Sequence, residues 1–230
     1  MKRSGALQRP GGVAAFAAAL TYVLGFAVLF GPLAERPATI DGGLLYLLER
    51  RALVTGWYLV IYVAFGVALL VLALALFERL RAYAPALSSV ARALALVWVT
   101  LVVAAGMCRV VGLDAAGALL ADDAPRAVTL WLVVETIADG LGGGIEAVGG
   151  LWLMLLGIAG WRSGIDARGV HALALVSGAA GLLTVLPPLG TLGAVFGLGQ
   201  IAWFVGIGRA LVRTPQIDEP PGRGGCGSSG

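Results

Sequence analysis

The segment LVTGWYLVIYVAFGVALLVLALALF, residues 53–77, contains no charged residue and decides the fold. A helix needs about 20 apolar residues to cross the hydrocarbon core of a bilayer. Five further apolar runs follow the same pattern, at Gly11–Phe30, Val90–Val111, Gly143–Trp161, His171–Leu186 and Thr191–Val212. The pattern predicts an all-α, polytopic membrane protein in which six transmembrane helices form one bundle.

The composition excludes the main soluble classes. Hydrophobic residues make up 59% of the chain and charged residues 13%, and the mean hydropathy is +0.93. A soluble domain carries about a quarter charged residues, so too little polar surface is present for a water-exposed globule. The net charge of +3 is scattered over the ends of the runs, and we therefore expect no nucleic-acid partner. Residues 1–213 form one domain in this interpretation, and residues 214–230, rich in Pro, Gly and Ser, are expected to be a disordered tail.

The distribution of basic residues predicts the topology. Cytoplasmic loops are enriched in Lys and Arg. With the N-terminus inside, eleven of the sixteen basic residues fall on the inner side, and the outer side receives Arg36, Arg50, Arg51, Arg109 and Arg126. Six spans then return the C-terminus to the same side. Together with the preference for Arg over Lys, this predicts a multi-pass protein of a bacterial cytoplasmic membrane with both termini inside.

The outer connections differ in length and character. Residues 31–52 include an apolar group near Asp41 and Glu49, which predicts a short interfacial helix. Residues 114–142 are expected to be a long outer segment that opens with Asp122 and Asp123. Only Pro187 to Gly190 separate the last two runs, so these runs are predicted to form an antiparallel hairpin.

Three carboxylates near the fourth run are the main candidates for chemistry. Glu135, Asp139 and Glu146 are four and seven residues apart, which places them on nearly one helix face if the helix is continuous. Ionised side chains in hydrocarbon are costly and normally face the bundle interior or water. Arg109 lies at a depth similar to that of Glu146, so the two are expected to form an ion pair. Such a pair could bind an anionic group, relay a proton or lock two helices.

A simpler alternative stands beside this interpretation. Gly140 and residues 142–144 are expected to bend or interrupt the helix. Glu135 and Asp139 would then lie in water at the outer surface, and Glu146 would either pair inside the bundle or extend toward the interface.

The remaining polar positions favour structural roles. Gln200, in the middle of the last run, is predicted to form an interhelical hydrogen bond, with a polar cavity as the alternative. His171 is the single histidine, so neither a bis-histidine haem site nor a multi-histidine metal site can be built, and we expect no metal and no cofactor. The many glycines of the fourth and sixth runs are attributed to close helix packing. No HExxH motif or nucleophile motif supports a catalytic residue.

Three stretches carry a resemblance to a known group of proteins. They are GGGIEAVGGLW at residues 142–152, GLLTVLP at residues 181–187 and FGLGQIAWF at residues 196–204, with YVLGF at residues 22–26 as a further similarity. The chain resembles a bacterial family of membrane proteins of roughly 230 residues that is defined only as a domain of unknown function. The resemblance implies six transmembrane helices and implies no activity or functional residue.

Three function classes follow from these observations. The first, which the sequence favours most, is a non-enzymatic protein that packs with itself or with a membrane partner, in sensing or scaffolding. The second is a small transporter or a lipid- or small-molecule-binding protein with an outward-facing polar cavity around Arg109, Asp139, Glu146 and Gln200. The third, which the sequence favours least, is a membrane-embedded enzyme that uses the same carboxylates. The lipid bilayer is the one partner that all three share, and the sequence leaves a homo-oligomer open.

Overall fold

The computed structural model describes residues 6–213, which are helical and contain no strand. The predicted tail at residues 214–230 lies outside the described residues. The elements in chain order are α1 (Gln8–Phe30), α2 (Ile40–Glu49), α3 (Arg51–Tyr58), the π-helical turn η1 (Leu59–Ala64), α4 (Phe65–Leu80), α5 (Pro85–Leu119), α6 (Ala124–Ala138), the π-helical turn η2 (Asp139–Gly143), α7 (Ala147–Ser163), α8 (Arg168–Leu183), the 3₁₀ turn η3 (Pro187–Leu189) and α9 (Leu192–Arg213).

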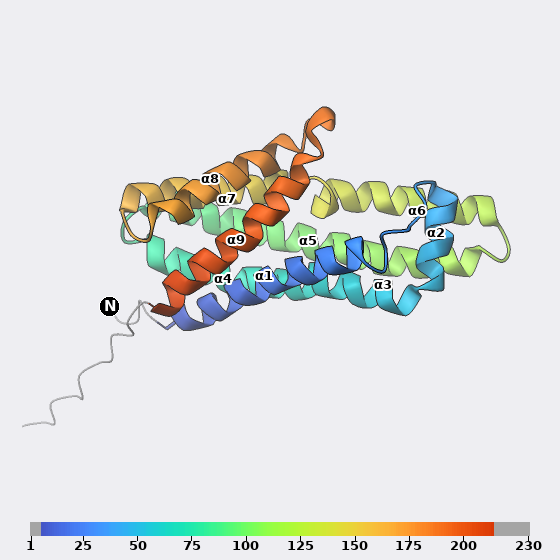
Figure 1. The fold of residues 1–230 in the computed structure, drawn as a ribbon, viewed down its shortest axis with the longest axis horizontal. Helices are drawn as coiled ribbons and strands as arrows, with labels where there is room; N and C mark the ends of the chain where they lie inside the picture. The colour runs from blue at the N-terminus through green and yellow to red at the C-terminus, as the bar shows by residue number, and fades with distance from the viewer. Residues whose placement is uncertain (1–5, 214–230) are drawn as a thin grey trace, which may run out of the picture.

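The helices run along one long axis, and the molecule has two distinct ends (Figure 1). At the end that we call the terminal end, α1 begins and α9 finishes, and the α4–α5 and α7–α8 turns lie beside them. The opposite end, called the α2 end, carries α2 and the α5–α6 turn. A close approach of Gly12 to the Gly208 carbonyl joins α1 to α9 near the terminal end. An even number of membrane crossings would place the start of α1 and the end of α9 at the same end of the bundle, as observed.

The expectation of a membrane protein is confirmed in its coarser form. Five helical segments are long and apolar enough to cross a membrane, namely Gln8–Phe30, Arg51–Leu80, Pro85–Leu119, Ala124–Ser163 and Leu192–Arg213. Large apolar side chains such as Val13, Val67 and Leu198 are 60% or more exposed on their outer faces. Lipid is the solvent that such a surface requires. The predicted fifth run corresponds to α8, which at 16 residues is shorter than the other five.

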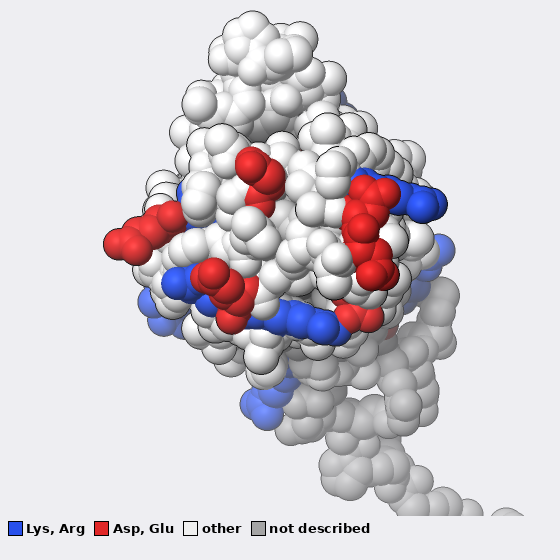
Figure 2. Space-filling view, turned by 90° about the vertical axis from the view of Figure 1, so that its right-hand side faces the viewer, with Lys and Arg blue, Asp and Glu red and all other residues white. Residues whose placement is uncertain are grey.

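The connections at the α2 end combine one expected helix with one unexpected helix. The short helix expected in residues 31–52 is present as α2. The segment expected to be a long loop after residue 113 instead continues α5 to Leu119 and then forms α6, which packs antiparallel along α5. Since α5 has 35 residues, it is about 50 Å long and exceeds the roughly 30 Å hydrocarbon core. The surface of the α2 end carries acidic and basic side chains interspersed, with no large patch of one sign (Figure 2).

Glycines set the close packing of α7 against α8, the most extensive helix pair in the bundle. A Cβ atom on Gly150 would lie 2.5 Å from the Leu182 nitrogen and 2.6 Å from the Gly178 carbonyl oxygen. A Cβ atom on Gly178 would in turn lie 2.7 Å from the Gly150 carbonyl oxygen. Backbone thus contacts backbone, which only glycine permits here. The packing role expected for Gly150 agrees with this geometry.

A buried ion pair closes the terminal end. Arg79 donates from Nη2 to Asp166 Oδ1 at 2.5 Å and from Nε to Asp166 Oδ2 at 3.2 Å. His171 Nε2 lies 2.7 Å from the Ile165 carbonyl oxygen, so the histidine fixes the same α7–α8 turn. The pairing ties α4 to the α7–α8 turn, and its two-point geometry compensates two charges that are mostly shielded from solvent.

The α7–α8 contact generates the first prediction. Gly150→Leu should lower the free energy of unfolding in detergent by at least about 2 kcal/mol, because the side chain would collide with the α8 backbone. The same change at Gly56, an exposed α3 position with nothing within 4 Å of its Cβ direction, should be neutral or slightly stabilising. Circular dichroism during a denaturing-detergent titration measures both, and equal stability of the two variants would contradict the packing interpretation.

Candidate functional site

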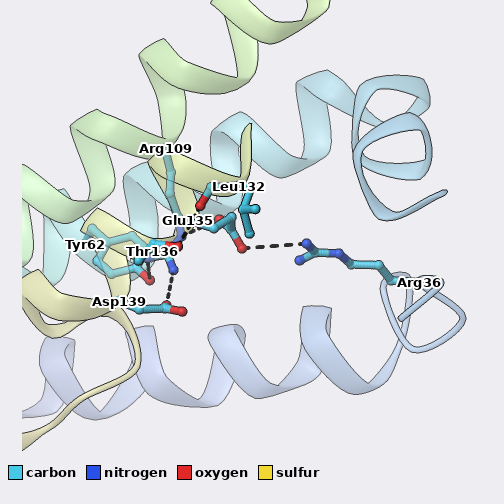
Figure 3. A network of polar contacts seen from close by, with 7 residues as sticks. All are labelled: Arg36, Tyr62, Arg109, Leu132, Glu135, Thr136 and Asp139. Atoms are coloured by element: carbon cyan, nitrogen blue, oxygen red, sulfur yellow. Dashed lines mark hydrogen bonds and ion pairs between the residues drawn. The ribbon is translucent and has the colours of Figure 1, made fainter. Parts of the chain in front are cut away.

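Arg109 on α5 is buried, with 5% of its surface exposed, and each of its three side-chain nitrogens has a partner (Figure 3). Nε donates to Glu135 Oε1 at 2.9 Å, Nη1 donates to Tyr62 Oη at 2.7 Å and Nη2 donates to Asp139 Oδ1 at 2.5 Å. The three partners come from α6, η1 and η2. Arg109 on α5 therefore joins η1 to the end of α6 and the following turn η2.

Glu135 also reaches a second arginine. Its Oε2 lies 3.6 Å from Arg36 Nη2, which belongs to the connection between α1 and α2 (Figure 3). Glu135 thus bridges Arg109 and Arg36. The two carboxylates Glu135 and Asp139 lie four residues apart, so one turn at the end of α6 presents both of them to Arg109.

The glycine-rich segment after α6 gives the chain room to pass the guanidinium. Gly142 has φ of +104°, a conformation that favours glycine, and the helix path breaks there. A Cβ atom on Gly143 would collide with Arg109 Nη1 and with the Ala138 carbonyl oxygen. The interruption expected from the glycines is present, and its local cause is the close approach to Arg109.

Tyr62 and Tyr58 belong to the site, and sequence reasoning missed both functional contacts. The guanidinium carbon of Arg109 lies 5.5 Å from the Tyr62 ring centre and 5.9 Å from that of Tyr58, within the range of cation–π attraction. Tyr62 lies within the π turn η1, where wider winding changes which side chains share a face. A tyrosine hydroxyl inside an uncharged run was the available signal, but the sequence gives no sign of the π turn that directs it.

A cavity of about 320 Å³ lies beside the Arg109 network. Its lining includes the charged groups Arg36, Arg109, Glu135 and Glu146. The remaining wall is mostly apolar and includes eight aromatic side chains, namely Tyr22, Phe26, Trp57, Tyr58, Tyr62, Phe65, Trp98 and Phe196. Leu29, near the end of α1, borders the cavity and is itself 41% exposed.

Packed aromatic rings close one side of the cavity. Trp98, which lines the cavity, packs on Trp152 with ring centres 5.4 Å apart, and Trp152 packs on Trp203 at 5.5 Å. All three tryptophans are 2% exposed or less. The Arg79–Asp166 pair lies beyond Trp203 at the terminal end, where Arg79, Asp166 and Trp203 border a second, much smaller pocket. Packed rings therefore separate the main cavity from the terminal end.

Glu146 lines the cavity without pairing with Arg109, so the predicted ion pair is wrong. Glu146 occupies the N-cap position of α7, and its backbone N–H donates to Thr184 Oγ1 at 2.8 Å. Within residues 6–213 its carboxylate has no hydrogen bond and no ion pair. The reason is the break at Gly142, which removes Glu146 from the helix face that Glu135 and Asp139 share and leaves those two to Arg109.

The other two predicted site residues lie apart from the cavity wall. Asp139 holds Arg109, but its side chain is 52% exposed, and it does not line the cavity. Gln200 is completely buried, and neither atom of its side-chain amide has a partner among the described residues. The interhelical hydrogen bond expected for Gln200 is absent from the described part of the chain. Arg109 and Glu146 are thus the two predicted residues that share the cavity.

The Arg109 network generates the second prediction. Arg109→Gln should destabilise the protein by about 3 kcal/mol, because it removes the buried cation that Glu135 and Asp139 share and leaves Glu135 with only the longer contact to Arg36. Arg109→Lys should recover only part of this loss, since a single ammonium cannot reproduce the planar three-way geometry. Arg126→Gln, at an exposed position on α6, should change the unfolding free energy by less than about 0.5 kcal/mol. A stability of Arg109→Gln equal to that of the Arg126 control would contradict this role.

Comparison with known proteins adds no relative to this geometry. No protein-family model, no curated protein and no solved structure matches the chain. The resemblance to a bacterial membrane family therefore stays a prediction. The cavity, its charges and its aromatic wall carry the functional interpretation by themselves.

Proposed function

We propose that this protein binds a small amphiphilic molecule in the cavity beside Arg109, and that the cavity opens toward the outer face of a bacterial cytoplasmic membrane. The observation that carries the proposal is a pocket of about 320 Å³ with a charged side and an aromatic wall. Ligand sites are concave, mostly apolar and equipped with a few fixed polar groups, and they begin at about 300 Å³. An amphiphile offers one polar part and one apolar part to such a wall.

The positions of the charges support this orientation. Arg9, Arg81, Arg162, Arg168 and Arg213 lie at or near helix ends on the terminal side, which the positive-inside rule assigns to the cytoplasm. Arg92 and Arg109 are 17 residues apart on α5, or about 25 Å along a helix. The charged side of the cavity therefore falls near the outer edge of the hydrocarbon core.

A sixth crossing by α8 completes this topology. α8 lies against α7 and α9, and six alternating crossings bring both termini to the cytoplasmic side. Its 16 residues correspond to about 24 Å, so local thinning of the bilayer or the following turn would make up the difference. Polar groups are scarce on α8 after His171, which agrees with a lipid environment.

Binding accounts for the site better than the other two function classes. A protein that only packs or forms a scaffold has no use for an accessible cavity that contains an uncompensated carboxylate. An enzyme needs an activated nucleophile, a proton-transfer pair or a metal at the reacting atoms. All three side-chain nitrogens of Arg109 already donate hydrogen bonds. Ser177 of α8 is buried against Gly199 of α9. The second class, a binding or carrier protein, is therefore the one that the geometry favours.

The third prediction tests occupancy of the cavity with dansylamide, an uncharged fluorescent amphiphile. Trp57 and Trp98 line the cavity and should transfer excitation energy to a bound dansyl group in lipid nanodiscs. Gly193→Phe should abolish this signal, because Gly193 borders the cavity and a side chain there meets only Thr184 Cγ2, at 3.9 Å.

The matched control is Gly190→Phe, in the exposed turn before α9. It adds the same ring outside the cavity and should leave the signal unchanged. Equal signals from wild type, both variants and empty nanodiscs, once corrected for lipid partitioning, would contradict the proposed function.

A further inference from the structure

We propose that the ligand is an organic cation, such as a quaternary ammonium or protonated amine with an apolar body, and that Glu146 is its counter-ion. This inference rests on the proposed function and adds the charge of the ligand to it. It comes from the charges around the cavity and from the partners that each of them already has.

When the whole Arg109 network is counted, including Asp139 outside the cavity wall, one carboxylate at the cavity has no partner among the described residues. Arg36 and Arg109 supply two positive charges, and Glu135 and Asp139, which contact them, supply two negative charges. Glu146 lines the same cavity, and no described residue pairs with its carboxylate. A cation is the partner that compensates a carboxylate bordering an apolar wall.

Arg109 already holds three acceptors, two of them carboxylates, and is a poor receptor for an anion. Its Nε, Nη1 and Nη2 atoms already donate to Glu135, Tyr62 and Asp139, at distances between 2.5 and 2.9 Å. These bonds use three of the five N–H groups of the guanidinium, and an anionic ligand at the other two would lie beside Glu135 and Asp139 and would then face Glu146. The role in anion binding considered from sequence is therefore disfavoured, and Arg109 instead holds the charged side in place.

The aromatic wall suits a cation as well as an apolar group. Aromatic faces attract cations, and recognition of quaternary ammonium groups by several rings is the main functional use of this attraction. Tyr22, Phe65, Trp98 and Phe196 line the cavity. Tyr22 and Phe65 pack edge to face at 5.3 Å, as do Phe65 and Trp98 at 5.6 Å. These contacts hold the rings in a fixed arrangement before a ligand enters.

The position of Glu146 is fixed by the start of α7. Glu146 is the N-cap residue of α7, so the beginning of this helix sets its backbone position. The hydrogen bond from its N–H to Thr184, whose hydroxyl donates to the Gly181 carbonyl at 2.7 Å, anchors the backbone to α8. Replacement of the carboxylate by an amide leaves both of these contacts in place.

Three dansyl probes of different charge provide the test in lipid nanodiscs. Dansylcholine is cationic, dansylamide is neutral and dansylglycine is anionic at pH 7. Energy transfer from tryptophan should show dansylcholine binding about tenfold or more tightly than dansylamide, and dansylglycine binding most weakly. Glu146→Gln should remove the preference for dansylcholine while leaving the affinity for dansylamide within about twofold of the wild-type value.

The control is Asp122→Asn, which removes an exposed carboxylate in the α5–α6 turn and should leave all three affinities unchanged. Glu146→Asp keeps the charge and should keep the preference, which covers the case in which the glutamine variant fails to fold.

The possible failures separate the two proposals. If no probe gives a saturable signal that Gly193→Phe removes, the proposed function itself fails. If dansylamide binds in the cavity but dansylcholine binds no better, the cationic preference is overturned and the binding function stands. If dansylcholine is preferred equally by wild type and Glu146→Gln, the assignment of Glu146 is overturned.

Discussion

The cost of burying one guanidinium constrains the rest of this structure. Arg109 lies in a bundle made mostly of apolar helices, where an unpaired charge would cost several kcal/mol. Two carboxylates and a tyrosine hydroxyl compensate it, and each acceptor comes from a different element. The π turn in the second long helix and the glycine break after α6 both border this arginine. The π turn and the glycine break, two local irregularities of the backbone, thus both lie at the Arg109 site.

The same constraint shapes the cavity. Because Glu135 and Asp139 turn toward Arg109, the chain must break before α7 begins, and Glu146 then stands alone at the start of that helix. The side of the cavity facing α6 is consequently charged but internally compensated, with Glu146 as the exception. Packed aromatic rings separate this cavity from the Arg79–Asp166 pair at the terminal end. Separated from the terminal end in this way, the cavity is that of a binding protein or of one state of a carrier.

The sequence predicts those features that depend on local pattern. Uncharged runs indicate helices in lipid, the glycines at 140–144 indicate a break, and the apolar group in residues 31–52 indicates the short helix α2. The pairing of charged side chains is harder to predict from sequence. It depends both on the depth of a residue along its helix and on its orientation around the helix axis. Arg109 and Glu146 agree in depth, but the break turns Glu146 away, and the π turn brings in Tyr62 without any signature in the sequence. The continuation of α5 to Leu119 was missed because its last two turns, which contain Asp114, carry too little hydrophobicity to extend a span.

A double-mutant cycle on the unfolding free energy tests the central claim most directly. The cycle compares Arg109→Gln and Glu135→Gln, singly and together, with the same cycle on Arg109 and Glu146. If Arg109 is held by the α6 carboxylate while Glu146 stands free, the coupling energy of the first pair should exceed about 1 kcal/mol and that of the second should be within about 0.5 kcal/mol of zero. A strong coupling between Arg109 and Glu146, with none between Arg109 and Glu135, would contradict the account.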